Sequence, residues 1–320
     1  MTTTSTSASN DSAMFRRVVW AYYRKHGRHD LPWRKTRDPY RILVSEVMLQ
    51  QTQVERVIPY YRAFLAKFPT APALARAPLS EVLRAWQGLG YNRRAKNLHA
   101  AARKIAEGAI SFSPYRTKMI SPRGRAEELE RLPGVGKYTA RAVAAFALGE
   151  PSVFVETNIR TAVIHHFFSK PLRTSNAKRS RKSPKTSNEN CHCICIYSDN
   201  SDAKITDAQI EEVLARAMPK DRERVRDWYF ALMDYGAHLK RSGVRLNAAS
   251  KHYAKQARFA GSAREARGAI LRELAKGSRS AGELGGLFGA ARRAQVRGAL
   301  AALHAEGLVK RRGARYGLAR

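Results

Sequence analysis

A glycine-rich stretch near the middle of the chain, residues 132–140 (LPGVGKYTA), constrains the fold most strongly. Pro133 ends a preceding helix, and Gly134 and Gly136 allow positive φ and a close approach of the backbone. An apolar helical pattern follows over residues 138–148, and the glycine after it is suited to end a helix. The stretch therefore predicts a tight hairpin between two helices. The amide groups at the start of the second helix can bind a phosphate, although a plain helix–helix turn is the alternative.

The charge of the chain indicates the class of its partner. The formal net charge is +33 over 320 residues, which favours a polyanion, with nucleic acid as the first candidate. A basic protein of the membrane surface is the rival, but no apolar run approaches the length of a membrane span. Residues 1–13 are rich in Ser and Thr and lack the apolar stretch of a secretory signal, so we expect them to be disordered.

The three cysteines lie together at Cys191, Cys193 and Cys195, with His192 between them. This is no disulfide framework, and it indicates a reducing environment. Structural zinc sites pair cysteines two to four residues apart and add a distant second pair, so we expect no metal here.

Apolar residues recur at spacings of three and four through most of the chain, which predicts an all-α fold. Helices are expected at residues 15–25, 40–50, 54–68, 78–86, 91–105, 138–148, 159–168 and at two places between 206 and 236. Asn158 is a candidate cap for the helix at 159–168. Arg93, Arg94 and Lys96 are expected to face solvent or phosphate.

The remaining segments divide the chain into predicted domains. Residues 14–240 form the main helical domain, in which the Ser-, Lys- and Asn-rich stretch 170–204 is read as a disordered insertion. Residues 241–262 form a basic linker. Residues 263–320 show three helical patterns and a terminal β-hairpin, and this arrangement resembles a winged helix-turn-helix that contacts DNA. An ordinary small helical appendage is the alternative.

Four motifs together resemble one family, the helix-hairpin-helix DNA glycosylases, and within it the MutY-type adenine glycosylases. They are LPW at 31–33, SEVMLQQTQV at 45–54, GLGY at 88–91 and the glycine-rich hairpin, and the resemblance resumes in ALMDYGA at 231–237. The resemblance implies two helical subdomains that flank a catalytic cleft. It also implies excision of adenine mispaired with guanine or 8-oxoguanine, as part of base excision repair.

The resemblance also assigns catalytic roles. Glu46 matches the acid that protonates adenine and handles the water. Glu156 stands where the family carries an aspartate, and Asn158 matches its neighbouring asparagine. Tyr138 stands where bifunctional relatives carry a Schiff-base lysine. Lys137 is adjacent but faces a different direction at a helix start, so a monofunctional glycosylase without strong lyase activity is expected.

The remaining matched residues are expected to contact DNA. Gln50, Gln51 and Thr52 match a corner that probes the gap left by the extruded base, and Tyr91 matches a wedge beside the opposing purine. The phosphate-holding hairpin comprises Leu132, Gly134, Val135, Gly136 and Lys137.

The chemistry of base removal is consistent with these residue types. A base inside a duplex must be extruded, and the gap must be filled. Two carboxyl groups can divide the hydrolysis of a glycosidic bond between an acid and an ionised stabiliser. Burial on an apolar helix would raise the pKa of Glu46, and a helix start would favour ionised Glu156. Read singly, Glu46 is equally well a buried helix residue and Glu156 an electrostatic cap.

The chain departs from the family in three ways. No cysteine follows the motif at 231–237, so no iron–sulfur cluster, no metal and no other cofactor is expected. The winged-helix segment is expected where the family carries a Nudix-like domain that reads 8-oxoguanine. Glu156 replaces an aspartate, and its extra methylene moves the carboxylate by roughly 1 Å, a misplacement that can cost about 10²-fold in rate.

Two other functions remain open. One is a glycosylase for thymine or uracil opposite guanine, and the other is a non-catalytic binder of mismatched or damaged DNA. The expected partner in each case is double-stranded DNA with a mismatch or oxidised base, with no membrane involved. We expect a monomer in the cytoplasm, associated with the nucleoid, or in the nucleus if the source is eukaryotic.

Overall fold

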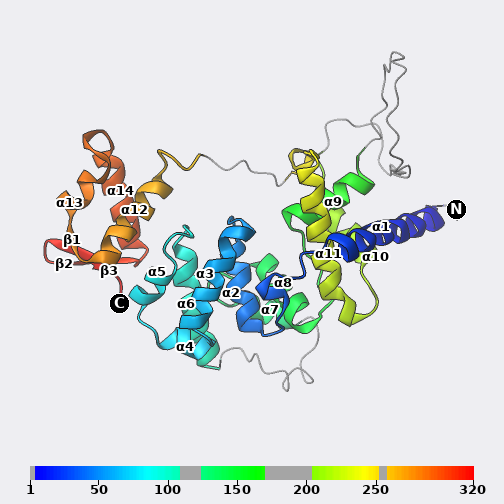
Figure 1. The fold of residues 1–320 in the computed structure, drawn as a ribbon, viewed down its shortest axis with the longest axis horizontal. Coiled ribbons are helices and arrows are strands. Elements are labelled where there is room, and N and C mark those ends of the chain that lie inside the picture. Colours follow the sequence, from blue (N-terminus) through cyan, green and yellow to red (C-terminus); the bar gives the residue numbers. More distant parts are fainter. Residues whose placement is uncertain (1–3, 109–123, 170–203, 252–257) are drawn as a thin grey trace, which may run out of the picture. The chain divides into compact units, whose positions relative to one another are not determined.

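The computed structural model of the chain describes residues 4–108, 124–169, 204–251 and 258–320, and helices dominate it, confirming the all-α fold (Figure 1). The chain forms two compact units. One combines Met1–Arg28 with Val153–Ala254, and the other combines His29–Ser152 with Lys255–Arg320. Each unit joins two separate stretches of chain, whereas the sequence predicted consecutive domains. Helical periodicity reveals which face of a helix is buried but not which distant segment covers it.

The first unit is a helical bundle. Its helices are α1 (Thr4–His26), α9 (Thr157–Phe167), α10 (Asp207–Ala217) and α11 (Arg222–Arg241), followed by a 3-10 turn at Asn247–Ala249. α11 packs against α9 and α1, and α1 also packs against α10. Phe15 lies at the centre, edge-on to Phe167 at 5.1 Å and to Trp228 at 5.8 Å between ring centroids.

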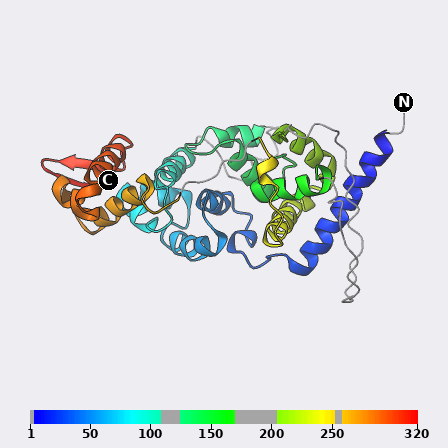
Figure 2. The same ribbon diagram turned by 90° about the horizontal axis from the view of Figure 1, so that it is seen from above.

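Helix α1 begins at Thr4, inside the segment 1–13 for which the sequence predicted disorder. Figure 2 shows α1 as one continuous helix. Asp11 and Ser12 are buried, so this part of the helix already contributes to packing. Extending an existing helix needs no new nucleation, and a run of Ser, Thr and Ala can therefore remain helical.

The second unit contains the hairpin. Its first stretch forms η1 (Pro32–Arg34), α2 (Pro39–Leu49), α3 (Val54–Lys67), α4 (Ala71–Arg76), α5 (Leu79–Ala85), α6 (Arg93–Ala106), α7 (Gly124–Glu130) and α8 (Lys137–Leu148). α8 packs against both α2 and α7. It ends at Gly149, whose φ of 65° is the left-handed conformation that the sequence predicted for a helix end.

The second stretch forms the winged-helix segment. It comprises α12 (Ala263–Lys276), β1 (Arg279–Ser280), α13 (Ala281–Gly285), η4 (Gly286–Phe288), η5 (Ala290–Arg292), α14 (Arg293–Ala305), β2 (Val309–Arg312) and β3 (Arg315–Leu318). The predicted three helices and hairpin are present. β1 adds an antiparallel third strand in the order β1-β3-β2. Two residues are too few to show a strand pattern in the sequence.

Some predictions concern residues that the structure does not describe. Residues 170–203, with Cys191, Cys193 and Cys195, and residues 252–257 of the expected linker lie outside the described residues. Within the described ranges, no three His, Cys, Asp or Glu side chains gather as a metal site would require. None of the described helices is long and apolar enough to cross a membrane.

Candidate active site and nucleic-acid interface

Glu46 carries its carboxyl group on α2, a largely apolar helix. Asp38 caps α2 by accepting hydrogen bonds from the backbone amides of Tyr40 (2.8 Å) and Arg41 (3.4 Å). Most of the helix that follows is buried, and Glu46 is only 5 % exposed. The predicted burial of Glu46 is confirmed, and its catalytic role stays a prediction.

Tyr138 is the direct partner of Glu46. Its phenolic hydroxyl donates a hydrogen bond to Oε2 of Glu46 over 3.1 Å. Both residues belong to the second unit, in which α8 packs on α2. Lys137, one residue earlier on α8, is exposed. The hairpin therefore sets a tyrosine, and not the neighbouring lysine, against the buried carboxyl group.

The hairpin is anchored by its apolar residues and opened by its glycines. Leu132 and Val135 are buried, so only their backbone is available to a ligand. Gly134 has φ of 76°, and a Cβ there would lie 2.6 Å from Cβ of Asn97. Gly136 precedes α8 and has no side chain to cap the first amides. These amides are the groups that hold an anion at a helix start.

Two residues that are expected to contact DNA have unusual backbone conformations. Gln51 has φ of 57° and Tyr91 has φ of 47°, and among the described residues other than glycine they alone have positive φ. Such conformations cost about 1–3 kcal/mol and persist where the surrounding structure holds them. The resemblance had singled out Gln51 for the gap left by the extruded base and Tyr91 for a wedge beside the opposing purine. Beside them, Nε2 of Gln50 donates to Oγ1 of Thr139 over 3.2 Å.

Arg94 holds both loops, and the sequence prediction for it was wrong. It was expected to face solvent or phosphate, but it is 9 % exposed. Its Nη1 donates to the carbonyl oxygens of Val47 (2.8 Å), Met48 (2.8 Å) and Gln50 (2.7 Å). Its Nη2 donates to Oγ1 of Thr52 (3.2 Å) and to the carbonyl oxygens of Leu89 (3.2 Å) and Gly90 (3.1 Å).

The guanidinium of Arg94 therefore closes the carbonyl end of α2 and fixes the loop that carries Tyr91. Burial lowers the pKa of Arg94 to about 10. The only available signal in the sequence was its spacing of three residues from Tyr91. That spacing predicts proximity on a helix but not a guanidinium directed back into a turn.

Glu156 and Asn158 form a second polar group, in the first unit. Glu156, and not Asn158, caps α9: its Oε2 accepts from the amide of Asn158 over 2.7 Å. Its Oε1 accepts from Oγ1 of Thr157 (2.6 Å) and Nδ2 of Asn158 (3.1 Å). The helix begins at Thr157, two residues earlier than expected, because the longer glutamate side chain still reaches the first free amides.

Lys240 completes this group and was not predicted. Its Nζ donates to Oδ1 of Asn158 over 2.8 Å. Burial lowers the pKa of Lys240, and the charge of Glu156 opposes that shift. A lysine 82 residues away in the chain gives no sequence signal for this contact.

Gly236, from the motif at 231–237, brings α11 against the start of α9. A Cβ on Gly236 would lie 1.9 Å from the carbonyl oxygen of Asn158. Two residues earlier, Asp234 is 2 % exposed and pairs with Arg28 over 2.7 Å. The predicted site residues thus fall into two groups. Glu46 and Tyr138 belong to the second unit, and Glu156 and Asn158, to which Lys240 adds, belong to the first.

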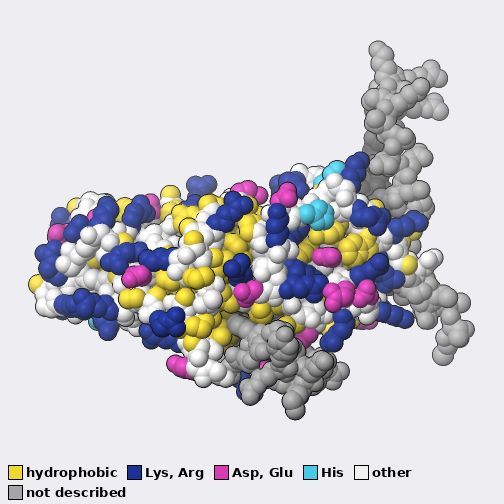
Figure 3. Space-filling view, turned by 60° about the horizontal axis from the view of Figure 1, so that its bottom comes forward, with side chains coloured by type: hydrophobic (Ala, Val, Ile, Leu, Met, Phe, Trp, Pro, Cys, Tyr) yellow, Lys and Arg dark blue, Asp and Glu magenta, His cyan; other side chains and the backbone are white. Residues whose placement is uncertain are grey.

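Among the charged side chains on the face seen in Figure 3, Lys and Arg are widely distributed and Asp and Glu are fewer. This distribution follows from the formal net charge of +33. A surface of this kind favours a polyanionic ligand.

Comparison with known proteins agrees with the motifs. Residues 44–186 match the family model described as HhH-GPD superfamily base excision DNA repair protein. The chain is 47% identical over 153 residues to the adenine DNA glycosylase of Mycolicibacterium smegmatis, covering 47% of this chain and 49% of the relative. It is 36% identical over 154 residues to that of Buchnera aphidicola, covering 48% and 41%.

A solved structure agrees as well. The fold is similar to that of a thermostable thymine-DNA glycosylase, with a TM-score of 0.51 and 25% identity, covering 76% of this chain and 97% of the other. The match spans less than half the length of the two adenine DNA glycosylases. Residues 44–186 are therefore similar to the HhH-GPD superfamily of base excision DNA repair proteins, and the same part of the chain is similar to the adenine DNA glycosylases.

Proposed function

We propose that this protein is a monofunctional DNA glycosylase that removes adenine mispaired with guanine or 8-oxoguanine. The observation that carries the proposal is the buried Glu46 with its hydrogen bond to Tyr138 behind the hairpin. The relatives named adenine DNA glycosylase support the choice of base. The ligand is duplex DNA, and the reaction needs no cofactor.

The chemistry is a hydrolysis of the N-glycosidic bond. Adenine leaves with the bonding electron pair and takes a proton from the Glu46 carboxyl group. Water then bonds to C1′ of the sugar and gives a proton to the Glu46 carboxylate, so that free adenine and an abasic site are formed. Glu156 supplies negative charge to the electron-poor sugar. A phenol cannot form an imine with C1′, so Tyr138 leaves the strand intact.

DNA recognition is assigned to the two strained residues and the hairpin. Gln51 and Tyr91 enter the gap left by the extruded base, one by hydrogen bonding and the other by stacking. The amides at the start of α8 hold a phosphate. Because Arg94 fixes both loops, the two side chains enter together.

A second candidate is a glycosylase for thymine or uracil opposite guanine, and the similarity to a thymine-DNA glycosylase over 97% of that chain favours it. Duplexes with A:G, A:8-oxoG, T:G and U:G pairs separate the two. Strand breaks only after alkali and only at adenine are expected. Breaks at thymine or uracil would support the second candidate, and binding without breaks would mean a non-catalytic mismatch binder.

A further inference from the structure

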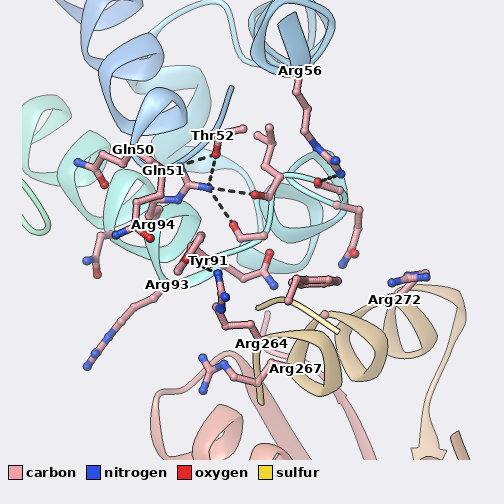
Figure 4. Close-up of a pocket in the computed structure, with 18 of the residues that line it drawn as sticks. Gln50, Gln51, Thr52, Arg56, Tyr91, Arg93, Arg94, Arg264, Arg267 and Arg272 are labelled. Carbon is pink, nitrogen blue, oxygen red and sulfur yellow. Dashed lines mark hydrogen bonds between the residues drawn. The ribbon is translucent and has the colours of Figure 1, made fainter. Parts of the chain in front are cut away.

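A pocket with a cavity volume of about 1010 Å³ lies in the second unit, beside Tyr91. One wall is the corner at residues 50–53 with the loop at 87–94. The other wall is the segment 259–272, mainly α12 of the winged-helix segment. We call it the arginine pocket because six arginines line it, and Figure 4 shows them on both walls: Arg56, Arg93, Arg94, Arg264, Arg267 and Arg272.

Specific contacts join the two walls. Nη1 of Arg264 donates to the hydroxyl of Tyr91 over 2.6 Å, and its guanidinium lies 5.5 Å from the centre of the Tyr91 ring. Nε of Arg84 donates to the carbonyl oxygen of Ala275 over 3.3 Å, and Lys96 bonds to the carbonyl oxygen of Glu306. The winged-helix segment thus completes the pocket with side chains directed at the residue expected to enter DNA.

The charge of the arginine pocket is strongly positive. Among the described residues that line it, Glu306 is the only acid, and both of its oxygens bond to Arg267, at 2.9 and 2.6 Å. The charge of Arg93 also acts on Glu306, so the lining sets one acid against six arginines. Such a cavity favours an anion, and phosphate suits the planar guanidinium group.

The arginine pocket also offers an aromatic face. Phe259 is 59 % exposed at its edge, an unusual state for a large apolar side chain. Aromatic side chains within a positively charged groove are the platform on which unpaired bases stack. Gly268 also lines this wall, and a Cβ there would meet nothing within 4 Å, so a longer side chain at this position has room to enter the pocket.

We propose that the arginine pocket is a nucleotide-binding site, in which arginines hold the phosphate and Phe259 stacks on the base. The nucleotide comes either from an unpaired stretch of DNA or from a free nucleotide. If the nucleotide is part of DNA, this inference rests on the proposed function; if it is a free nucleotide, the inference is independent of it. The geometry of the two walls stands independently of which base is excised.

The test uses the full chain and a fluorescein-labelled single strand of thymidines, which offers no adenine to excise. Fluorescence anisotropy gives the dissociation constant. Phe259→Ala is expected to weaken binding about tenfold, in line with the loss of one stacked base. Gly268→Gln fills the cavity and is expected to weaken binding at least as much. Gly268→Ala, which changes the helix without filling the pocket, is the matched control and should bind as the natural chain does.

Salt dependence tests the phosphate contact. Arg272→Gln should reduce the slope of log K against log salt by about 0.7, the value for one phosphate of a single strand. Thymidine monophosphate, added at the same nucleotide concentration, identifies the source. Displacement of the strand supports a free nucleotide, and no displacement supports a DNA strand. The site would be overturned if Phe259→Ala, Gly268→Gln and Arg272→Gln all bound the strand with the affinity and salt dependence of the natural chain.

Excision on an A:8-oxoG duplex separates this proposal from the proposed function. If the variants bind the single strand normally while adenine is still removed, nucleotide binding at the arginine pocket is refuted and the proposed glycosylase activity is supported. If adenine is never removed but the variants still lose the single strand, the pocket stands and the proposed function falls.

Discussion

The hydroxyl of Tyr138 lies 3.1 Å from Oε2 of Glu46, so the residue at the lyase position bonds to the proposed catalytic acid. In relatives with a lysine at this position an amine would take that place. In the proposed reaction, the contact links how the base is protonated to whether the strand is cut.

Tyr138→Lys is expected to add strand cleavage, because an amine beside Glu46 can attack C1′ and form an imine. Borohydride should then trap a covalent protein–DNA adduct that the natural chain does not give. Lys137→Ala, which removes the exposed neighbouring amine, is the control and should leave excision without cleavage. Trapping by the natural chain would show that Lys137 or another lysine reaches the sugar.

Glu46→Gln should lower the single-turnover rate of adenine excision by about 10³-fold, within the range for loss of a general acid. The amide has nearly the same shape and can still accept the bond from Tyr138, so duplex affinity should change less than threefold. Excision kinetics and anisotropy on the same A:8-oxoG duplex measure the two effects. Turnover near the natural rate would remove Glu46 from the acid role.

Glu156→Asp is expected to raise the rate of excision, by up to about 10²-fold, because the shorter side chain withdraws the carboxylate by roughly 1 Å toward the family's position. Aspartate is a preferred N-cap, so the melting temperature should not fall. Thr157→Ala removes the hydroxyl bonded to Oε1 of Glu156 and keeps the capping bond from the amide of Asn158 to Oε2, so it tests the position of the carboxylate separately from the cap. A lower rate with aspartate would mean that the surrounding residues suit the glutamate.

Arg94→Lys should slow excision about tenfold and weaken duplex binding, because one ammonium cannot reach six acceptors on two loops. The reporter is 2-aminopurine placed beside the target adenine, whose fluorescence rises on base extrusion and should rise less here. If Arg94 served stability alone, the folded molecules of Arg94→Lys would give the same rise in 2-aminopurine fluorescence as the natural chain. Arg103→Lys, on the exposed side of the same helix, is the control and should behave as the natural chain does.

The sequence predicted features that depend on nearby residues. The hairpin, the end of α8 at Gly149 and the burial of Glu46 all follow from local patterns. For α9, Asn158 was the named candidate cap and Glu156 only an alternative electrostatic cap, because glutamate is an uncommon cap. Arg94 and Lys240 were missed because their contacts join segments far apart in the chain. The division into two units was missed for the same reason, since each is built from two stretches.

A pH effect on stability is expected from His166. Burial, with a smaller contribution from His165, lowers its pKa from 6.5 to about 4, and its Nε2 lies 2.8 Å from the hydroxyl of Tyr235. Since the unfolded chain binds this proton more tightly, the contribution is fully present above pH 6.5 and is lost as the pH falls toward 4. The loss at pH 4 is about 3 kcal/mol.

Urea unfolding between pH 7 and pH 4 measures this effect. In His166→Phe, which keeps a ring against Phe15, that part of the pH dependence should vanish, leaving the slope from carboxyl groups. Tyr235→Phe removes the hydroxyl but keeps the titrating ring, so its pH dependence should persist. Equal slopes in the natural chain and His166→Phe would show that the imidazole is already charged, or already free to charge, in the folded protein.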